Sequence, residues 1–351
     1  MPDMRFAPPK QLRIVDRAGG LNPERVRSYN EKLVLSLLLQ SDGISRLEIG
    51  ERSRLSAQTV SVIVRSLEQE GLVVQGEAVR GRVGPPTNPI LLNREGAYSV
   101  GISVTASRID IVLIDFLGRV RQHSTLPSDG QLTPASTRAV AATVKETLLQ
   151  VPDPARARVT GVGFCLPALD LLSMQPASHG DSGSRMHADL EAAIGLPVFM
   201  QDDITAAAGA EMMFGTTKRS SDYLFFFVAE VLYSRLVLNN HIYLGNYAVA
   251  PASHDIGTIV EAHQSPQGQV AAWLERCLGR LSELASGLAQ FVDYKTVVIA
   301  GETTDLVTRA LRDSLQSKMP TLHVVAGNTG PHARAVGAGS LPFISRFTVQ
   351  H

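Results

Sequence analysis

The feature that most restricts the fold of this chain is a pair of short helices followed by a hairpin, within residues 44–92. Ser45 precedes Glu48 by three positions, the spacing of a capping box, which predicts the start of a first helix. A second helix is predicted over 56–68, because its apolar residues recur every three or four positions and so share one buried face. Those apolar residues are Val60, Ile63, Val64 and Leu67.

A basic hairpin follows the second helix. One strand is predicted from Gly71 to Val74 and a return strand over 90–92, joined by a turn at 80–86. Two short helices, the second with a polar outer face, followed by such a hairpin, are typical of a winged helix-turn-helix DNA-binding domain. The polar outer face consists of Gln58, Thr59, Ser61 and Arg65.

This module predicts which side chains meet DNA. We expect Gln58 and Ser61 to reach base edges, because a glutamine can pair bidentately with adenine in the major groove. Contacts to phosphates or at the helix start are expected from Arg46, Arg54, Ser56, Thr59 and Arg65. The alternative is an ordinary solvated helix face, which the neighbouring helix and hairpin disfavour. Arg80 and Arg82 at the turn are predicted to enter a narrow minor groove, although a flexible exposed loop fits their composition equally well.

The composition is that of a soluble globular protein. The chain has 351 residues, 44% hydrophobic and 19% charged, enough for two or three domains. It shows no apolar run of the roughly 18 residues that a membrane span needs, and its first residues lack the apolar region of a secretory signal. Cys165 and Cys277 form no disulfide pattern, so we expect a cytoplasmic location with no membrane association.

The charge distribution permits DNA binding without demanding it. The formal net charge is zero, and residues 1–95 hold 14 Lys and Arg against 11 Asp and Glu. So small a surplus supports only weak non-specific affinity for DNA. Binding would therefore depend on a few well-placed contacts and on dimerisation.

The remaining chain reads as two successive α/β blocks. A first helix is predicted from Pro23 to about Gln40, and strands alternate with helices from Tyr98 onward. We expect two lobes with a cleft between them. The predicted units are an N-terminal arm over 1–21, the winged helix-turn-helix over 22–92, a first lobe over 93–205 plus about 335–351, and a second lobe over 206–334.

Beyond the DNA-binding module, a series of short motifs resembles the ROK family (repressors, open reading frames, kinases). The resemblance implies an α/β body with the two-lobe, actin-like and hexokinase-type (ribonuclease H-like) fold. It covers almost the whole chain from about residue 22. The motifs lie at 84–93, 96–101, 195–198, Asp203 with 206–208 and Glu211, 255–257, 298–301 and 335–339.

The phosphate-binding positions of the family are altered. Family kinases begin the first lobe with Asp-x-Gly-Gly-Thr-Lys, whose glycines let backbone amides approach ATP phosphates. The matching residues here are Ser103, Thr105, Ala106, Ser107 and Arg108. The second loop, 229–235, contains no glycine, and Glu230 would repel a phosphate. Because phosphoryl transfer depends on positioning and charge stabilisation, we predict that the chain is not an enzyme.

The family's zinc position is also altered. Family members use a His after Glu-Ile-Gly and a short Cys cluster. Thr258 takes the place of the His, and 264–270 contains no cysteine. His254 and His263 lie nearby without thiol or carboxylate partners, whereas structural zinc generally needs four ligands. We predict no zinc or other metal and no cofactor.

The sugar-binding corner is partly retained. Family members hold sugar hydroxyls with an Asn-Asp pair and with the Glu and His of Glu-Ile-Gly-His. The matching residues here are Asp202, Asp203, Asp255 and Thr258, and carboxylates suit a polyol because each can accept from adjacent hydroxyls. The alternative, of equal weight, is that Asp202 and Asp203 only cap the helix predicted over 204–214.

These observations predict a ligand-responsive transcriptional regulator, with a repressor as the favoured role and an activator left open. A small-molecule effector, with a sugar or sugar derivative as the candidate, would bind between the lobes of a homodimer or homotetramer and change its affinity for a double-stranded operator in carbohydrate metabolism. One alternative is a sugar kinase with an appended DNA-binding domain, which Asp203 at the family's base position supports. The other is a ligand-independent DNA-binding protein whose body only dimerises.

Overall fold

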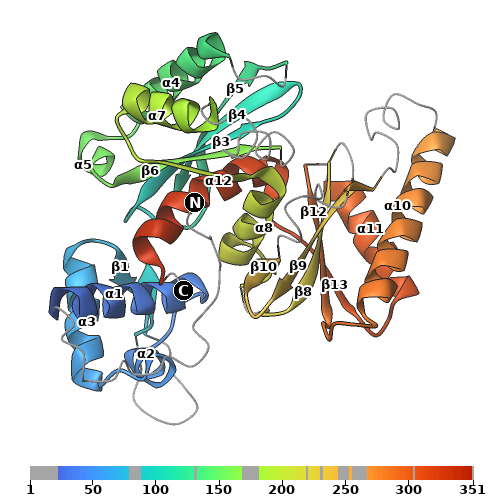
Figure 1. The fold of residues 1–351 in the computed structure, drawn as a ribbon. Helices are drawn as coiled ribbons and strands as arrows, with labels where there is room; N and C mark the ends of the chain where they lie inside the picture. The colour runs from blue at the N-terminus through green and yellow to red at the C-terminus, as the bar shows by residue number, and fades with distance from the viewer. Residues whose placement is uncertain are drawn as a thin grey trace.

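The computed structural model contains a small head and two larger lobes (Figure 1). The described residues are 23–78, 88–129, 133–167, 182–218, 220–229, 232–243, 253–254, 267–302 and 305–349. The two-lobe α/β body with an N-terminal winged helix-turn-helix confirms the predicted fold class.

The head consists of three helices and a two-stranded antiparallel sheet. Its elements are α1 (Pro23–Leu39), α2 (Arg46–Ser53), α3 (Ala57–Gln69), β1 (Val73–Gln75) and β2 (Ile90–Leu92). The apolar face predicted for α3 is buried, and all four of its predicted apolar residues are at most 4% exposed. Ile44 pairs with Ile90 in an isolated antiparallel bridge, which ties the segment before α2 to the wing.

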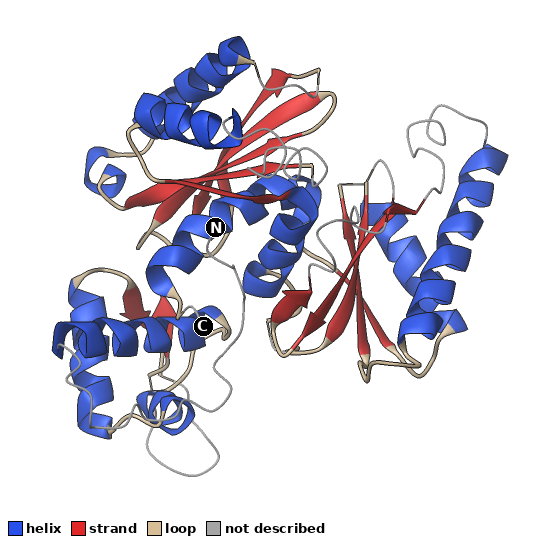
Figure 2. Cartoon of the chain, viewed as in Figure 1, coloured by secondary structure: helices blue, strands red, loops and turns tan. Residues whose placement is uncertain are grey.

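The first lobe is a five-stranded sheet with helices on both faces (Figure 2). Its strand order is β5-β4-β3-β6-β7, in which β3, β4 and β5 form an antiparallel meander and β6 and β7 continue parallel to β3. The strands are β3 (Tyr98–Val104), β4 (Arg108–Asp115), β5 (Val120–Pro127), β6 (Val159–Leu166) and β7 (Val198–Asp202). Its helices are α4 (Pro134–Leu149), the short α5 (Asp153–Arg156) and α7 (Ser182–Ile194).

The second lobe repeats the strand order of the first, as β10-β9-β8-β12-β13, with β8 antiparallel to β9 and parallel to β12. Such a repeat explains why strands and helices alternate in two blocks along the sequence. The strands are β8 (Tyr223–Val228), β9 (Leu232–Leu238), β10 (His241–Tyr243), β11 (Ser253–His254), β12 (Thr296–Gly301) and β13 (His323–Ala326). Its outer helices are α10 (Gln267–Leu288) and α11 (Asp305–Lys318).

Two helices lie between the sheets. They are α8 (Asp203–Phe214) and α12 (Ala333–Phe347), which follows the short 3-10 turn η1 (Gly330–His332). A β-carbon on Gly163 would lie 1.7 Å from the carbonyl oxygen of Ala338, and one on Gly337 would lie 1.9 Å from that of Ala206. Backbone therefore meets backbone where α12 crosses β6 and α8, and glycine is required at both crossings.

The head is packed against the body through one continuous core. That core contains α1 and α3 residues of the head together with Phe116, Met213 and the α12 residues Phe343 and Phe347. Lys32 of α1 donates to the carbonyl oxygen of Ser345 at 3.0 Å. A cavity of about 690 Å³ lies at this junction, with Leu38 of the head on one side and Val336 of α12 on the other.

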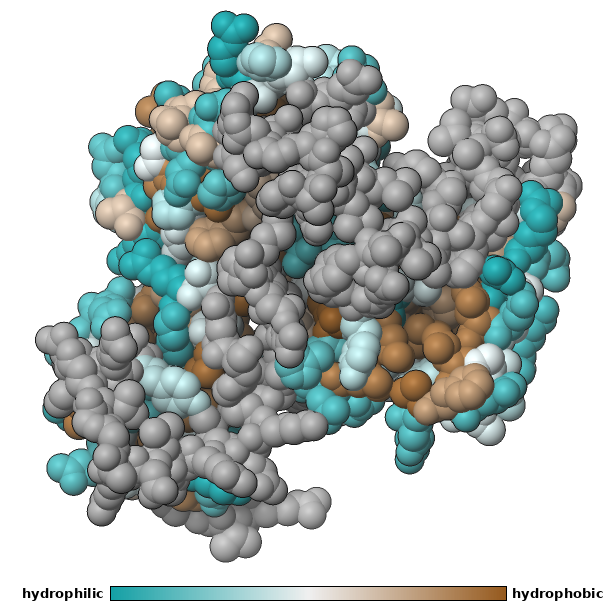
Figure 3. Space-filling view, viewed as in Figure 1, coloured by the Kyte–Doolittle hydropathy of each residue, from teal (hydrophilic) through white to brown (hydrophobic). Residues whose placement is uncertain are grey.

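The visible surface of the second lobe carries a group of hydrophobic side chains bordered by polar ones (Figure 3). In the part of the chain that the structure describes, none of the helices combines the length and the apolar character of a membrane span.

Candidate nucleic-acid interface and interlobe site

The turn between α2 and α3 is held by side-chain caps. The Ser45 hydroxyl accepts from the Glu48 amide at 3.2 Å, and the Glu48 carboxylate accepts from the Ser45 amide at 2.9 Å, so the predicted capping box is present. The Ser45 amide and the Ser45 hydroxyl both donate to the Glu48 carboxylate, and these two bonds lower the pKa of Glu48. Arg54 ends α2 with φ of 59°, a left-handed conformation that turns the chain toward α3 and leaves its side chain exposed.

The outer face of α3 is accessible, as a DNA-reading helix requires. Gln58, Ser61 and Arg65 are exposed, and Thr59 is half-buried. Val62, which the sequence pattern did not mark as a contact residue, is 59% exposed between these polar residues. An exposed valine on such a face suits contact with a thymine methyl group. Its position, four residues after Gln58 and three before Arg65, could have indicated that it lies on the polar outer face.

Several of the predicted contact residues already have partners. The Ser56 hydroxyl caps α3 by accepting from the Thr59 amide at 3.2 Å, and the Ser61 hydroxyl donates to the Ala57 carbonyl at 2.8 Å. Arg46 forms an ion pair with Glu68 at 3.2 Å, which joins the start of α2 to the end of α3. A phosphate contact by Arg46 would have to compete with Glu68, whereas Arg54 and Arg65 have exposed side chains.

Four predicted site residues lie outside the described residues. They are Arg80 and Arg82 of the wing and Asp255 and Thr258 of the second lobe. Their roles stay predictions.

At the interlobe site, Asp202 ends β7 and caps α8. Its Oδ1 accepts from the Thr205 amide at 2.8 Å and pairs with Arg235 Nη2 at 3.0 Å. Arg235 comes from β9 of the second lobe and also donates to the Thr205 hydroxyl at 3.1 Å. Asp202 and Arg235 are both at least 90% buried, so a charge from each lobe is neutralised by the other.

Asp203, the first residue of α8, pairs with a second arginine. Its Oδ2 lies 3.3 Å from Arg334 Nε, and Arg334 is only 1% exposed. The Arg334 guanidinium also lies 3.4 Å from Glu302 and stacks over the Phe227 ring at 5.3 Å. The carboxylate at the family's base position is therefore held by an arginine at the start of α12.

Arg108 extends this network into the first lobe. It begins β4, after a turn in which the Thr105 amide donates to the Arg108 carbonyl at 2.9 Å. Its side chain lies 3.4 Å from Glu302 and 2.6 Å from Asp110. The tight turn stands at the positions that match the family's first phosphate loop, and an amide of this turn is used within the chain itself.

The arrangement thus joins both lobes by alternating charges. Asp110, Arg108, Glu302, Arg334 and Asp203 form one continuous series of ion pairs. A polar ligand entering here would exchange contacts with these groups, and that exchange would change how the lobes are held together. The roles of Arg235 and Arg334 could not be predicted from sequence, because their partners Asp202 and Asp203 lie far away along the chain.

Comparison with known proteins supports both parts of this description. A family model described as winged helix-turn-helix DNA-binding matches residues 27–74. A xylose repressor of Bacillus spizizenii is 27% identical over 63% of this chain, and the matched region is 58% of that relative. This chain therefore spans less than two thirds of the length of that repressor.

Solved structures extend the likeness to the whole fold. A ROK family transcriptional regulator described as a homolog of the E. coli MLC protein has a TM-score of 0.62, with 15% identity over 91% of this chain and 96% of that one. A ROK family glucokinase from Streptomyces griseus has a TM-score of 0.54, with 18% identity over 70% of this chain and 99% of that one. The winged helix-turn-helix match and the two-lobe body therefore show that this chain shares its fold with ROK family proteins.

Proposed function

We propose that this protein is a cytoplasmic transcriptional repressor that binds an operator through its head and a small-molecule effector, a sugar or sugar derivative, between its lobes. The observation that carries the DNA-binding part is the exposed face of α3, where Gln58, Ser61, Val62 and Arg65 lie together. Helices that enter the major groove present such a mixture of amide, hydroxyl, methyl and guanidinium groups.

The coupling between effector and operator is proposed to run through α12. One end of this helix places Arg334 in the interlobe ion-pair network. The other end receives the Lys32 ammonium at Ser345, and the Val349 amide donates to the Ser36 hydroxyl at 3.3 Å. A change in lobe closure that moves α12 would therefore move α1 of the head (Figure 1).

The proposed effector would compete for the charges of Asp202, Asp203 and Arg334. Carboxylates and arginines can both bond hydroxyl groups, so a polyol fits the chemistry of this corner. An effector shifts operator affinity only when it binds one lobe arrangement more tightly than the other. Helix-turn-helix proteins commonly bind two half-sites about 34 Å apart with two heads, so we expect a homodimer or homotetramer.

The experiment that tests DNA binding is selection of sequences from random duplex DNA by the full chain, followed by affinity measurement at fixed salt. We expect one enriched motif whose binding is lost in the Gln58→Ala/Ser61→Ala variant. Binding that is equal for enriched and random duplexes would contradict the proposal. Effector control is then tested with a panel of sugars added to the selected complex, where a shift in operator Kd of at least about 5-fold is expected from ordinary coupling energies.

A sugar kinase is the second candidate, because the body shares its fold with a ROK family glucokinase. We infer instead that this body does not transfer phosphate, since Asp203 is paired with Arg334 and the turn at Thr105 uses an amide internally. ATP consumption measured across the same sugar panel separates the two. Turnover that rises with one sugar would assign the chain to the kinases.

A further inference from the structure

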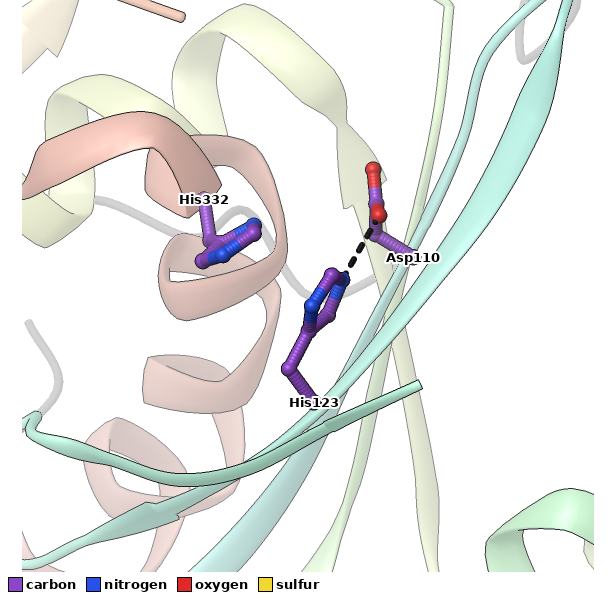
Figure 4. Close-up of side chains that lie close together, drawn as sticks. All are labelled: Asp110, His123 and His332. Carbon is purple, nitrogen blue, oxygen red and sulfur yellow. Dashed lines mark hydrogen bonds and ion pairs between the residues drawn. The ribbon is translucent and has the colours of Figure 1, made fainter. Parts of the chain in front are cut away.

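A cluster of two histidines and one aspartate lies on the first lobe, close to the start of α12 (Figure 4). Asp110 comes from β4, His123 from β5, and His332 from the turn that precedes α12. One ligand atom from each residue lies within 4.8 Å of the other two. The two imidazole rings have centroids 4.0 Å apart.

The carboxylate of this cluster is held in place by its other neighbours. Asp110 is 3% exposed, and its Oδ2 accepts from Arg108 Nε at 2.6 Å. Its Oδ1 lies 2.8 Å from His123 Nε2 and 3.1 Å from the Thr125 hydroxyl. Oδ1 therefore points at the histidines while Oδ2 is fixed by Arg108.

His332 supplies the observation that points to a ligand. Its Nδ1 is buried and has no hydrogen-bond partner among the described residues. A buried polar nitrogen without a partner carries a desolvation penalty, unless its lone pair binds a metal or a donor or its N–H donates a hydrogen bond.

We propose that Asp110, His123 and His332 bind a divalent first-row transition metal ion such as Zn²⁺, Co²⁺ or Ni²⁺. Imidazole suits these metals, and two histidines with one carboxylate form a recurrent three-ligand set that leaves an open position. Water or the Thr125 hydroxyl would occupy that position. The site takes the ion from solvent through the exposed His123.

The geometry needs only a small adjustment to accept an ion. Ligand atoms at about 2.0–2.1 Å from a tetrahedral metal lie roughly 3.3 Å from one another. Asp110 Oδ1 and His123 Nε2 would separate slightly from 2.8 Å, and the His332 nitrogen would move inward by up to about 1.5 Å, which is within the reach of side-chain rotation.

The electrostatic surroundings both oppose and assist binding. Arg108 repels a cation, but its bond to Asp110 orients the carboxylate as outer partners of metal ligands do. Burial lowers the pKa of His332, and the neighbouring His123 lowers it further.

None of these three residues matches the positions where ROK kinases hold zinc, which are 258 and 264–270 in this sequence. Because His332 immediately precedes α12, a bound ion would fasten the start of that helix to the β4–β5 hairpin. Metal binding would thus act on the helix that contacts the head.

The test is titration of the chelator-treated full chain with Co²⁺, followed by its visible absorption and by competition with Zn²⁺. We expect one ion per chain. His332→Ala and His123→Gln should each weaken binding at least about 10-fold, by analogy with losses at other metal sites. His123 lies on an exposed edge strand, so His123→Gln keeps the test valid if His332→Ala fails to fold.

Two controls make the result specific. His323→Gln alters an exposed histidine on β13, and His254→Gln/His263→Gln removes the histidines near the family's zinc position; both should bind Co²⁺ as the parent chain does. The proposal is overturned if the parent chain takes up no Co²⁺. It is equally overturned if His332→Ala and His123→Gln bind as tightly as His323→Gln, or if only the double variant loses the ion.

Discussion

At the residue scale, the packing of α12 depends on glycines, which have no β-carbon. A β-carbon on Gly163 would overlap the Ala338 carbonyl, and neither backbone can retreat because both belong to the centre of the first lobe. We expect Gly163→Ala to lower the free energy of unfolding by about 1–3 kcal/mol or more, as overpacked cores do. Denaturant unfolding of the full chain measures this loss.

The matched control is Gly279→Ala in α10. A β-carbon at Gly279 meets nothing within 4 Å, so alanine should stabilise that helix by up to about 1 kcal/mol. Equal effects of the two substitutions would show that the close approach at Gly163 has no energetic weight.

The cap at Ser45 makes a second prediction at this scale. Ser45→Ala removes the hydroxyl partner of Glu48 and should cost α2 about 1 kcal/mol, or roughly 5-fold faster amide exchange at neutral pH. Because the pKa of Glu48 is lowered in the folded chain, its contribution is present above the unfolded pKa and is lost as pH falls through the folded value. The difference in α2 hydrogen exchange between the parent chain and Ser45→Ala should therefore be smaller at acid pH than at neutral pH. A difference that persists unchanged in acid would argue against the carboxylate's part in the cap.

At the element scale, α3 offers a comparison between two glutamines on one helix. Gln58 lies in the first turn and Gln69 at the last residue, and both are exposed. We expect Gln58→Ala to weaken binding of the selected operator by about 1–3 kcal/mol and to relax its preference at one base pair. Affinity for single-base operator variants measures both effects.

Gln69→Ala is the control, because a residue about 16 Å along the helix axis lies beyond the bases that the first turns reach. A larger loss at Gln69 than at Gln58 would mean that α3 meets DNA in another orientation.

The elements themselves were largely predictable from sequence. The four apolar positions of α3 and the capping pair of α2 specify local structure by spacing alone, and both are confirmed. Helix α10 begins at Gln267, four residues before the point near Ala271 where the helical pattern of apolar residues begins. Alternating strands and helices indicated two lobes.

The contacts of the candidate site were harder to predict from sequence. Asp202 and Asp203 were identified, but Arg235 and Arg334 reach them only through tertiary packing, as Glu302 reaches Arg334. Pairs so far apart in sequence leave no periodic signal. Val62 was overlooked because an apolar residue in an amphipathic helix is ordinarily assigned to the core, whereas its angular position placed it outside.

At the scale of the whole molecule, Arg334 joins parts that are distant in sequence. Arg334→Met would leave Asp203 and Glu302 without this buried cation, and the free energy of unfolding should fall by about 3–5 kcal/mol. Calorimetry of the full chain measures the drop in Tm.

Arg309→Met is the control for this change. Arg309 pairs with Asp305 at 3.4 Å on the surface of α11, where both side chains are mostly exposed, so its removal should cost no more than about 1 kcal/mol. Similar losses for the two variants would contradict a structural role for the interlobe pairs.

The shared core of head and body has a consequence for biosynthesis. Leu38 and Ile63 of the head belong to the same cluster as Phe343 and Phe347, which the ribosome adds some 300 residues later. The emerging head therefore cannot complete its apolar interior while translation is still in progress. Nascent or prematurely terminated polypeptides would contain the head without the α12 side chains that pack against it, so the head reaches its final packing only after the full chain has been synthesised.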